Sequence, residues 1–221
     1  MGRLSYILRM YHLAIFDFDG TLADSFPCFL AALNEAAARY GFRGIDASEV
    51  AQLRGYSSWQ VMEHIDVAMW QVPMITQFVR KQMAERIETV TLFPRMHEAL
   101  EDLAARDVTI AVVSSNTEAS IRHVLGHRLA SLVSDYRCDV SIFGKRPKLR
   151  QVLAATGIGA PRTIAVGDEI RDLKAAHAEG IAFGGVSWGF TAPQALRAAD
   201  ADVMFEQVED IASLITRRYS A

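Results

Sequence analysis

Short apolar runs that end at a polar residue recur along the chain, and they mark the expected strands. Runs of this kind are typical of strands buried on both faces of a parallel sheet. They lie at Leu13–Phe16, Val108–Val113, Val140–Phe143, Thr163–Val166, Ile181–Val186 and Asp202–Phe205. Helical periodicity fills most of the gaps between them. This alternation predicts an α/β fold, with a Rossmann-like parallel sheet and helices on both of its faces.

Three helices are expected between the later strands. The first lies within "FPRMHEALEDLAA", with Pro94 near its first turn, a position that proline favours. The second covers Pro147–Ala155 and ends near Gly157. The third covers Ile170–Glu179 and ends at Gly180, because glycine is the usual residue just beyond a helix.

The gap between the first two strands is far longer than one crossover helix needs. Its helical segments are Ser25–Tyr40, Ala47–Leu53, Ser57–Ile65 and Met74–Ile87. Ser25 is expected to cap the first of them and Gly41 to end it. We therefore predict a small helical domain over residues 23–90, inserted into an α/β core made of residues 1–22 and 91–221.

The composition indicates a globular protein that does not bind nucleic acid or span a membrane. Hydrophobic residues make up 51% of the 221 positions, and the net charge of −3 leaves no basic excess for phosphate backbones. No apolar run approaches the roughly 20 residues of a membrane span. Met1–Tyr11 has no cleavage site of a signal peptide. Cys28 and Cys138 form no CxxC motif, so we expect a cytoplasmic protein without disulfides.

Polar residues follow the expected strands at the edge where parallel sheets bind ligands. They are Asp17, Asp19, Ser114, Ser115, Asn116, Lys145, Asp168 and Asp172. Four carboxylates on one rim repel each other unless a cation joins them. Because no histidine or cysteine stands among them, Mg²⁺ suits the set better than Zn²⁺. Hydroxyls, a lysine and the N–H groups of a helix start bind phosphate. The pattern predicts a site for Mg²⁺ and a phosphorylated small molecule.

The spacing of Asp17 and Asp19 indicates how such a site would react. Asp17 can attack phosphorus and form an aspartyl-phosphate. In an extended backbone Asp19 points to the same side, where it can protonate the leaving oxygen and later accept a proton from water. Gly20 permits the tight turn that frees both carboxylates from the strand.

Four ordered motifs carry a family resemblance: "DFDGTLADS", "VVSSN", a downstream lysine and "VGDEIRD". They resemble the haloacid dehalogenase-like hydrolase superfamily, and within it the phosphoglycolate phosphatase-like group with a helical cap inserted after the first motif. The resemblance implies that Asp17 is the nucleophile and a Mg²⁺ ligand. Asp19 would be the acid/base and a ligand through its carbonyl, Ser114 would bind the phosphoryl group, Asp168 would ligate Mg²⁺, and Asp172 would support the site. It implies a phosphatase, with phosphoglycolate as first candidate substrate.

The chain departs from this pattern at two positions. Many relatives carry Lys-Pro-x-Pro at the third motif, whereas this chain has "GKRPK". Spacing to the following apolar residues favours Lys145 as the motif lysine, with Lys148 as the alternative. Arg95 stands where relatives often have glycine, and we assign it no function.

Other functions remain open at this stage. A sugar-phosphate mutase would use the same aspartyl-phosphate and pass it to a second hydroxyl. A non-catalytic binding protein on this fold would have no need of both Asp17 and Asp19. Dehalogenase chemistry is disfavoured because such relatives lack an acid at the position of Asp19. Phosphonate hydrolysis is disfavoured because Lys81, alone in the inserted segment, lies on a stretch expected to face solvent.

The inserted segment offers one candidate contact for the rest of the substrate. Arg54, in "QLRGYSS", precedes a break between helices, where its guanidinium either reaches a second anion or is an ordinary surface arginine. The large apolar residues of the segment are expected to form its core instead of a substrate box. They are Trp59, Trp70, Phe78 and Met83. His123 and His127 have metal-like spacing but no third ligand, so a solvated helix face is expected.

Overall fold

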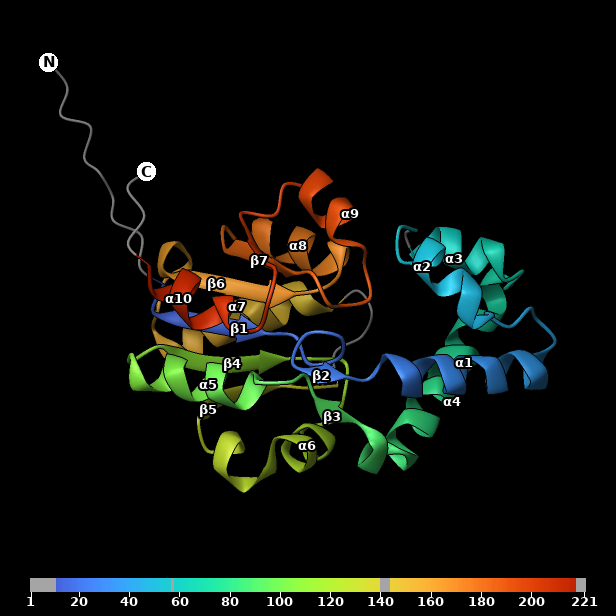
Figure 1. Cartoon of the computed structure of the whole chain (residues 1–221), viewed down its shortest axis with the longest axis horizontal. Coiled ribbons are helices and arrows are strands. Elements are labelled where there is room, and N and C mark those ends of the chain that lie inside the picture. Colours follow the sequence, from blue (N-terminus) through green and yellow to red (C-terminus); the bar gives the residue numbers. More distant parts are fainter. Residues whose placement is uncertain (1–10, 57, 140–143, 218–221) are drawn as a thin grey trace, which may run out of the picture.

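A parallel sheet forms the centre of the molecule in the computed structural model, which describes residues 11–56, 58–139 and 144–217 (Figure 1). Its strands within those ranges are β1 Leu13–Phe16, β4 Thr109–Val113, β5 Val133–Arg137, β6 Thr163–Gly167, β7 Ala182–Val186 and β8 Val203–Phe205. They lie in the order β5-β4-β1-β6-β7-β8, and every neighbouring pair is parallel. The predicted α/β fold is confirmed.

The central strand β1 ends level with both of its neighbours. Phe16, its last residue, pairs with Val112 of β4 and with Val166 of β6. The loops that follow these three strands therefore leave the sheet at one edge. This register brings the first, second and fourth motifs of the sequence together.

Helices cover both faces of the sheet, as predicted. One face packs against α5 Met96–Ala105, α6 Glu118–Ala130 and α10 Asp210–Thr216. The other face packs against α7 Lys145–Thr156, α8 Ile170–His177 and α9 Pro193–Ala198. Alternate side chains of β1 enter the two cores, Ala14 and Phe16 on the first side and Leu13 and Ile15 on the second. Complete burial on both sides explains why β1 reads as a continuous apolar run.

The edge strand β5 was not predicted from the sequence. It has the sequence VSDYR, and only Val133 is buried. An edge strand that is covered on one side needs no apolar run, so its pattern is weak. The predicted strand Val140–Phe143 lies outside the described residues.

The segment between β1 and β4 forms a helical unit beside the sheet, on the right in Figure 1. Its elements are α1 Phe26–Tyr40, α2 Val50–Leu53, α3 Ser58–His64 and α4 Val72–Glu85, with short 3-10 turns at Ala47–Glu49, Met69–Gln71 and Ile87–Thr89. Apolar side chains of these helices form a separate core, centred on Ala32, Leu53 and Ile75. We call residues 25–90 the inserted helices.

A two-stranded ribbon joins the inserted helices to the sheet domain. β2 Ala23–Asp24 pairs antiparallel with β3 Thr91–Leu92, so the chain leaves and returns at adjacent positions. The ribbon lies near residues 22 and 91, and the predicted division into a core and an inserted domain at these positions stays a prediction. That the two parts move as separate domains stays a prediction.

Two expectations about the inserted helices were wrong. Trp59 and Trp70 are 57% and 72% exposed instead of buried in the local core, and only Phe78 and Met83 pack against it. Ser25 occupies the position before α1, but its hydroxyl makes no capping hydrogen bond, because the backbone there is helical instead of extended. Gly41 ends α1 as expected, with φ of 75°.

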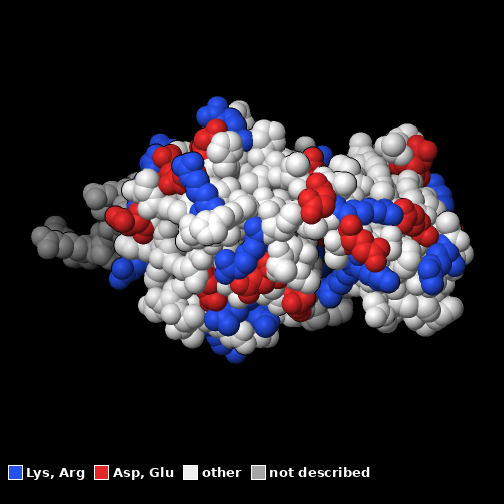
Figure 2. Space-filling view, turned by 90° about the horizontal axis from the view of Figure 1, so that it is seen from below, with Lys and Arg blue, Asp and Glu red and all other residues white. Residues whose placement is uncertain are grey.

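Charged side chains of both signs are intermingled on the face drawn in Figure 2. Many surface charges form ion pairs between helices. Glu179, directly beyond α8, binds Arg146 at 2.5 Å and Arg150 at 2.8 Å, and both arginines belong to α7. These two arginines lower the pKa of Glu179 to about 2. The ion pairs therefore hold the ends of α7 and α8 together.

Among the described residues, none of the helices combines the length and apolar character that crossing a bilayer requires.

Candidate active site

Asp17 stands directly after β1, where the chain turns sharply. Its carboxylate is buried and accepts a hydrogen bond from the Phe18 N–H at 2.8 Å. The turn then closes through Phe18, whose carbonyl accepts the N–H groups of Leu22 and Ala23. Gly20 lies inside this turn with φ of +71°, and a Cβ there would meet the Asp168 carboxylate at 2.4 Å. Only glycine satisfies both the conformation and the close approach.

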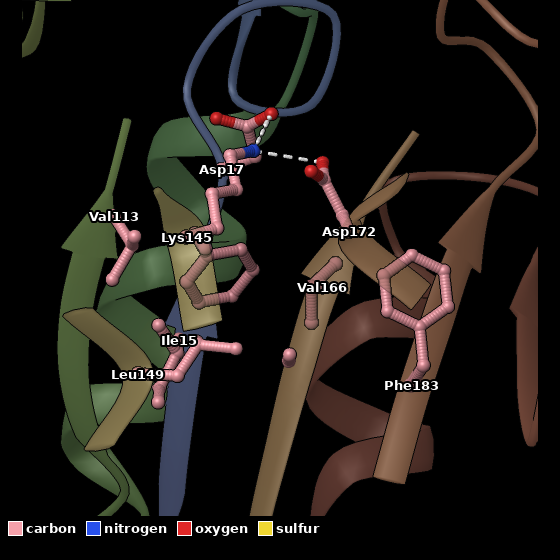
Figure 3. A pocket seen from close by; sticks show the side chains of 10 residues that line it. Ile15, Asp17, Val113, Lys145, Leu149, Val166, Asp172 and Phe183 are labelled. Atoms are coloured by element: carbon pink, nitrogen blue, oxygen red, sulfur yellow. Dashed lines mark ion pairs between the residues drawn. The ribbon is translucent and has the colours of Figure 1, made fainter. Parts of the chain in front are cut away.

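Lys145 lies between two carboxylates, as Figure 3 shows. Its Nζ is 2.5 Å from Asp17 and 2.8 Å from Asp172, and it is the first residue of α7. Burial by itself would lower the pKa of Lys145, but the charges of Asp17 and Asp172 raise it above its ordinary value. The lysine is therefore cationic. Lys148, the alternative motif residue, is only partly buried.

Asp168 and Asp172 approach Asp17 from β6 and α8. Asp168 accepts a hydrogen bond from the Phe190 N–H at 2.7 Å and one from the Thr21 hydroxyl at 3.3 Å. Burial and neighbouring carboxylates, Glu169 foremost among them, raise its pKa well above the usual range. Burial likewise raises the pKa of Asp172 to about 7, against the opposing charge of Lys145.

These carboxylates fit a hard divalent cation. One oxygen each of Asp17, Asp168 and Asp172 lies within 4.8 Å of the others, in the only cluster of its kind within residues 11–56, 58–139 and 144–217. Oδ1 of Asp172 and Oδ1 of Asp19 are buried and accept no hydrogen bond from any described residue, whereas Oδ2 of Asp172 is paired with Lys145. Buried acceptors without donors are rare in native proteins. An all-oxygen set suits Mg²⁺.

Asp19 occupies a different environment from Asp17. Burial, followed by the charge of Asp17, raises its pKa to about 6, while the side chains of Ser25 and Asn116 act in the opposite direction. The influence of Asn116 shows that the loop after β4 reaches the loop after β1. A carboxyl group with this pKa can both donate and accept a proton near neutral pH.

The loop after β4 presents hydroxyl and amide groups at the same edge. Ser114 is fully buried, and its Oγ accepts the Asn116 N–H at 3.1 Å. Ser115 is half-buried, and Thr117 caps the start of α6. The geometry is compatible with the phosphate-binding role expected for Ser114, Ser115 and Asn116, which stays a prediction.

One part of the site was not predicted from the sequence, the loop from Ser187 to Ala192 that follows β7. The Trp188 indole N–H donates to the Thr21 carbonyl at 3.1 Å, and Phe190 donates to Asp168. Gly189 fits so tightly that a Cβ would lie 2.1 Å from the Asp168 Cβ. The available signal was "WGF" directly after an expected strand, where aromatic residues flank a glycine.

A second residue of the site that was not predicted is Arg171, which lies between Glu169 and Asp172 in the last motif. Its guanidinium lies 2.5 Å from Glu169 and 3.9 Å from Asp172. Burial opposes its charge, but these acids raise its pKa. Arg171 therefore adds a second cation beside the carboxylates.

Arg54 contacts the sheet domain. It lies just beyond α2, and Nη2 donates to the carbonyl of Gly189 at 2.6 Å and to that of Ser187 at 3.3 Å. Its predicted role toward the substrate is not decided by these contacts.

Comparisons with known proteins agree with this arrangement. A family model described as "Haloacid dehalogenase-like hydrolase" matches residues 14–186. A phosphoglycolate phosphatase of Synechococcus elongatus is 35% identical over 204 residues, covering 92% of this chain and 96% of that protein. A pyrophosphatase PpaX of Oceanobacillus iheyensis is 22% identical over 207 residues, covering 91% and 95%. A solved haloacid dehalogenase-like hydrolase from Streptococcus pneumoniae superposes with a TM-score of 0.77 at 19% identity, covering 92% and 98%.

Proposed function

Because the chain belongs to the haloacid dehalogenase-like hydrolase family, we propose that it is a Mg²⁺-dependent phosphatase of small phosphorylated metabolites. The observation that carries this proposal is the cluster of the Asp17, Asp168 and Asp172 carboxylates, two of which, Asp17 and Asp172, pair with the Lys145 ammonium. Phosphoglycolate is the first candidate substrate, since a relative covered almost completely bears the name phosphoglycolate phosphatase.

In the first step an oxygen of Asp17 attacks phosphorus as the bond to the leaving oxygen breaks. Lys145 holds the Asp17 carboxylate in place and lies close enough to offset charge on the phosphoryl oxygens. Asp19 gives its proton to the leaving oxygen, so the alcohol departs neutral. The product of this step is an aspartyl-phosphate on Asp17.

In the second step water attacks the phosphorus of the aspartyl-phosphate. Asp19, now ionised, accepts a proton from that water. The bond between phosphorus and the Asp17 oxygen breaks, which releases inorganic phosphate and restores both carboxyl groups. Ser114 and the amides of the loop after β4 would hold the phosphoryl oxygens through both steps.

Asp17, Asp168 and the backbone carbonyl of Asp19 would hold Mg²⁺, whose charge would offset that of the phosphoryl group. Asp172 supports this site by fixing the Lys145 ammonium at 2.8 Å. We further propose that the inserted helices act as a cap that excludes water from the site.

The test is phosphate release from a panel of phosphorylated metabolites, with and without Mg²⁺. The panel includes 2-phosphoglycolate and pyrophosphate, because the relatives carry both kinds of name. We expect Mg²⁺-dependent turnover that Asp17→Asn abolishes, since an amide is a poor nucleophile and a neutral metal ligand. Turnover that survives this substitution would refute the mechanism.

The same panel separates hydrolysis from transfer. A mutase would move the phosphoryl group between hydroxyls of a sugar phosphate and release little inorganic phosphate. Absence of both activities would indicate a binding protein.

A further inference from the structure

The loop Ser187–Ala192 contacts three parts of the molecule at once. Towards the site, the Phe190 N–H holds Oδ2 of Asp168 at 2.7 Å. Towards the turn after β1, Trp188 donates to the Thr21 carbonyl. Towards the inserted helices, the Ala192 N–H donates to the Arg54 carbonyl at 2.6 Å. One short loop therefore links the position of the inserted helices to the position of Asp168, a predicted metal ligand.

The guanidinium of Arg54 adds to the backbone contact. Nη2 donates to the carbonyls of Gly189 and Ser187, so the side chain spans the middle of the loop. Arg54 is half-buried, and its Nε–H donates to no partner among the described residues. Because both bonds start from one guanidinium nitrogen, they tie the middle of the loop to the end of α2.

Aromatic contacts connect the same loop to α1. The Phe190 ring lies 5.1 Å from the Phe26 ring in an edge-to-face arrangement and 5.6 Å from the Phe29 ring. Both partners belong to the first inserted helix. The other side of Phe190 meets the turn after β1, because a Cβ on Gly20 would lie 2.7 Å from its ring. Phe190 is thus wedged between the inserted helices and the loop that carries the nucleophile.

We propose that Arg54 is a positioning residue, which clasps the loop Ser187–Ala192 and thereby fixes the Asp168 carboxylate for the cation. The hydrogen bonds of the clasp order the loop, and the Phe190 N–H then orders Asp168. Site assembly becomes dependent on contact with the inserted helices. The kinetic consequence rests on the proposed phosphatase function, whereas the structural consequence does not.

The first test is amide hydrogen exchange of the metal-free protein, which requires no catalysis. We compare the Phe190 amide in the wild type, Arg54→Ala and Arg54→Lys. Loss of the two side-chain hydrogen bonds should speed exchange about three- to tenfold in Arg54→Ala, with Arg54→Lys intermediate. Lys81→Ala is the matched control, since it removes one cation from the inserted helices at a site 71% exposed. Equal exchange in all four proteins would overturn the clasp.

The second test is cation affinity, measured by titrating Mn²⁺ into each protein without substrate. The clasp predicts about three- to tenfold weaker binding in Arg54→Ala and none of this loss in Lys81→Ala. Should Arg54→Ala fail to fold, Arg54→Lys decides the comparison. Unchanged affinity in a folded variant contradicts the proposal.

Kinetics then separate the clasp from contact with substrate. A clasp acts on the site itself, so 2-phosphoglycolate and p-nitrophenyl phosphate should lose the same factor in kcat/KM. A loss confined to 2-phosphoglycolate, with exchange and Mn²⁺ binding unchanged, would assign Arg54 to the substrate carboxylate instead. If the wild type hydrolyses neither compound, the proposed function fails while the exchange result still judges the clasp.

Discussion

Two carboxyl groups only two residues apart acquire different chemistry from their surroundings. The Asp17 carboxylate is paired with the Lys145 ammonium at 2.5 Å, and this ion pair holds the proposed nucleophile in place. Asp19 has a buried oxygen without a donor among the described residues, and its pKa is raised to about 6.

Asp19→Asn should lower turnover of alkyl phosphates by about 10²–10⁴-fold, because the leaving alkoxide loses its proton donor. A nitrophenolate leaves without a proton, so the first step with p-nitrophenyl phosphate should be spared. The second step still needs a base. Rapid mixing should therefore show a burst of nitrophenol followed by slow turnover. Equal loss of the first step for both kinds of substrate would exclude the acid role.

Lys145→Ala should reduce kcat/KM by roughly 10²–10³-fold, the usual effect of removing one charge-stabilising group. Lys148→Ala, on the same helix but only partly buried, should change it less than about twofold. Steady-state kinetics of both variants make the comparison, with circular dichroism to verify the fold. If Lys148→Ala were the more damaging, the motif lysine would have been assigned incorrectly.

The sequence predicted the residues that stand at strand ends, because the position of a side chain after a parallel strand follows from local pattern. It did not predict the loop Ser187–Ala192. That loop acts through backbone N–H and carbonyl groups, as in the bonds of Phe190 and Gly189. Such bonds depend on which segments lie next to each other in the fold. They involve backbone groups that every residue carries, so the residue type does not predict them.

At the level of elements, apolar runs and helix ends were predicted where both faces are buried or a glycine ends the helix. The edge strand β5 and the exposed Trp59 and Trp70 were not. β5 lies at the edge of the sheet, and the two tryptophans lie on the surface. Periodicity does not show whether another element covers a given position. The Arg95 anomaly has an explanation in the backbone, since its φ is +66° at the start of α5.

Arg95→Gly should match or exceed the wild type in stability, because glycine adopts this left-handed conformation without strain. Arg95→Val should lose about 1–2 kcal/mol, since a β-branched side chain is disfavoured there. The ion pair of Arg95 with Glu209 is exposed and contributes little. Urea unfolding of the three proteins measures the order. A valine variant as stable as the glycine variant would contradict the argument.

Glu179 should make the contact between α7 and α8 sensitive to acid. Its pKa is lowered from 4.5 to about 2 in the folded state, so its stabilising effect is complete above pH 4.5. The effect is lost as the pH falls from 4.5 toward 2, because the carboxylate is then protonated. Wild type and Glu179→Gln should differ in unfolding free energy at pH 6 and converge toward pH 3. A difference that grows in acid would refute this.

For the molecule as a whole, the acid cluster links stability to the cation. In the metal-free protein the pKa values of Asp19 and Asp172 are raised to about 6 and about 7, against 3.8 ordinarily. Between pH 3.8 and about pH 7 the folded state therefore binds more protons than the unfolded state. Stability of the metal-free protein should therefore decrease as the pH rises from 5 to 8.

Mg²⁺ favours the ionised carboxylates and should raise Tm more at pH 8 than at pH 5. Thermal unfolding with Mg²⁺ or with EDTA at both pH values measures this. The doubly substituted control Asp17→Asn/Asp168→Asn should show almost no response to Mg²⁺. An increase in Tm that is equal at the two pH values would show that Mg²⁺ does not stabilise the protein through these acids.

The short ribbon β2/β3 brings the two ends of the inserted helices together at the edge of the sheet domain. Ala23 and Leu92 pair and hold the two ends of the inserted helices side by side. The inserted helices are therefore connected to the sheet domain in the same way as a hairpin loop. The entropy of closing a loop increases by only about 0.6 kcal/mol for each doubling of its length. Helical units of other sizes can therefore be grafted onto the same ribbon at little entropic cost, provided that they keep the contacts that Arg54 and Phe26 make with the loop Ser187–Ala192.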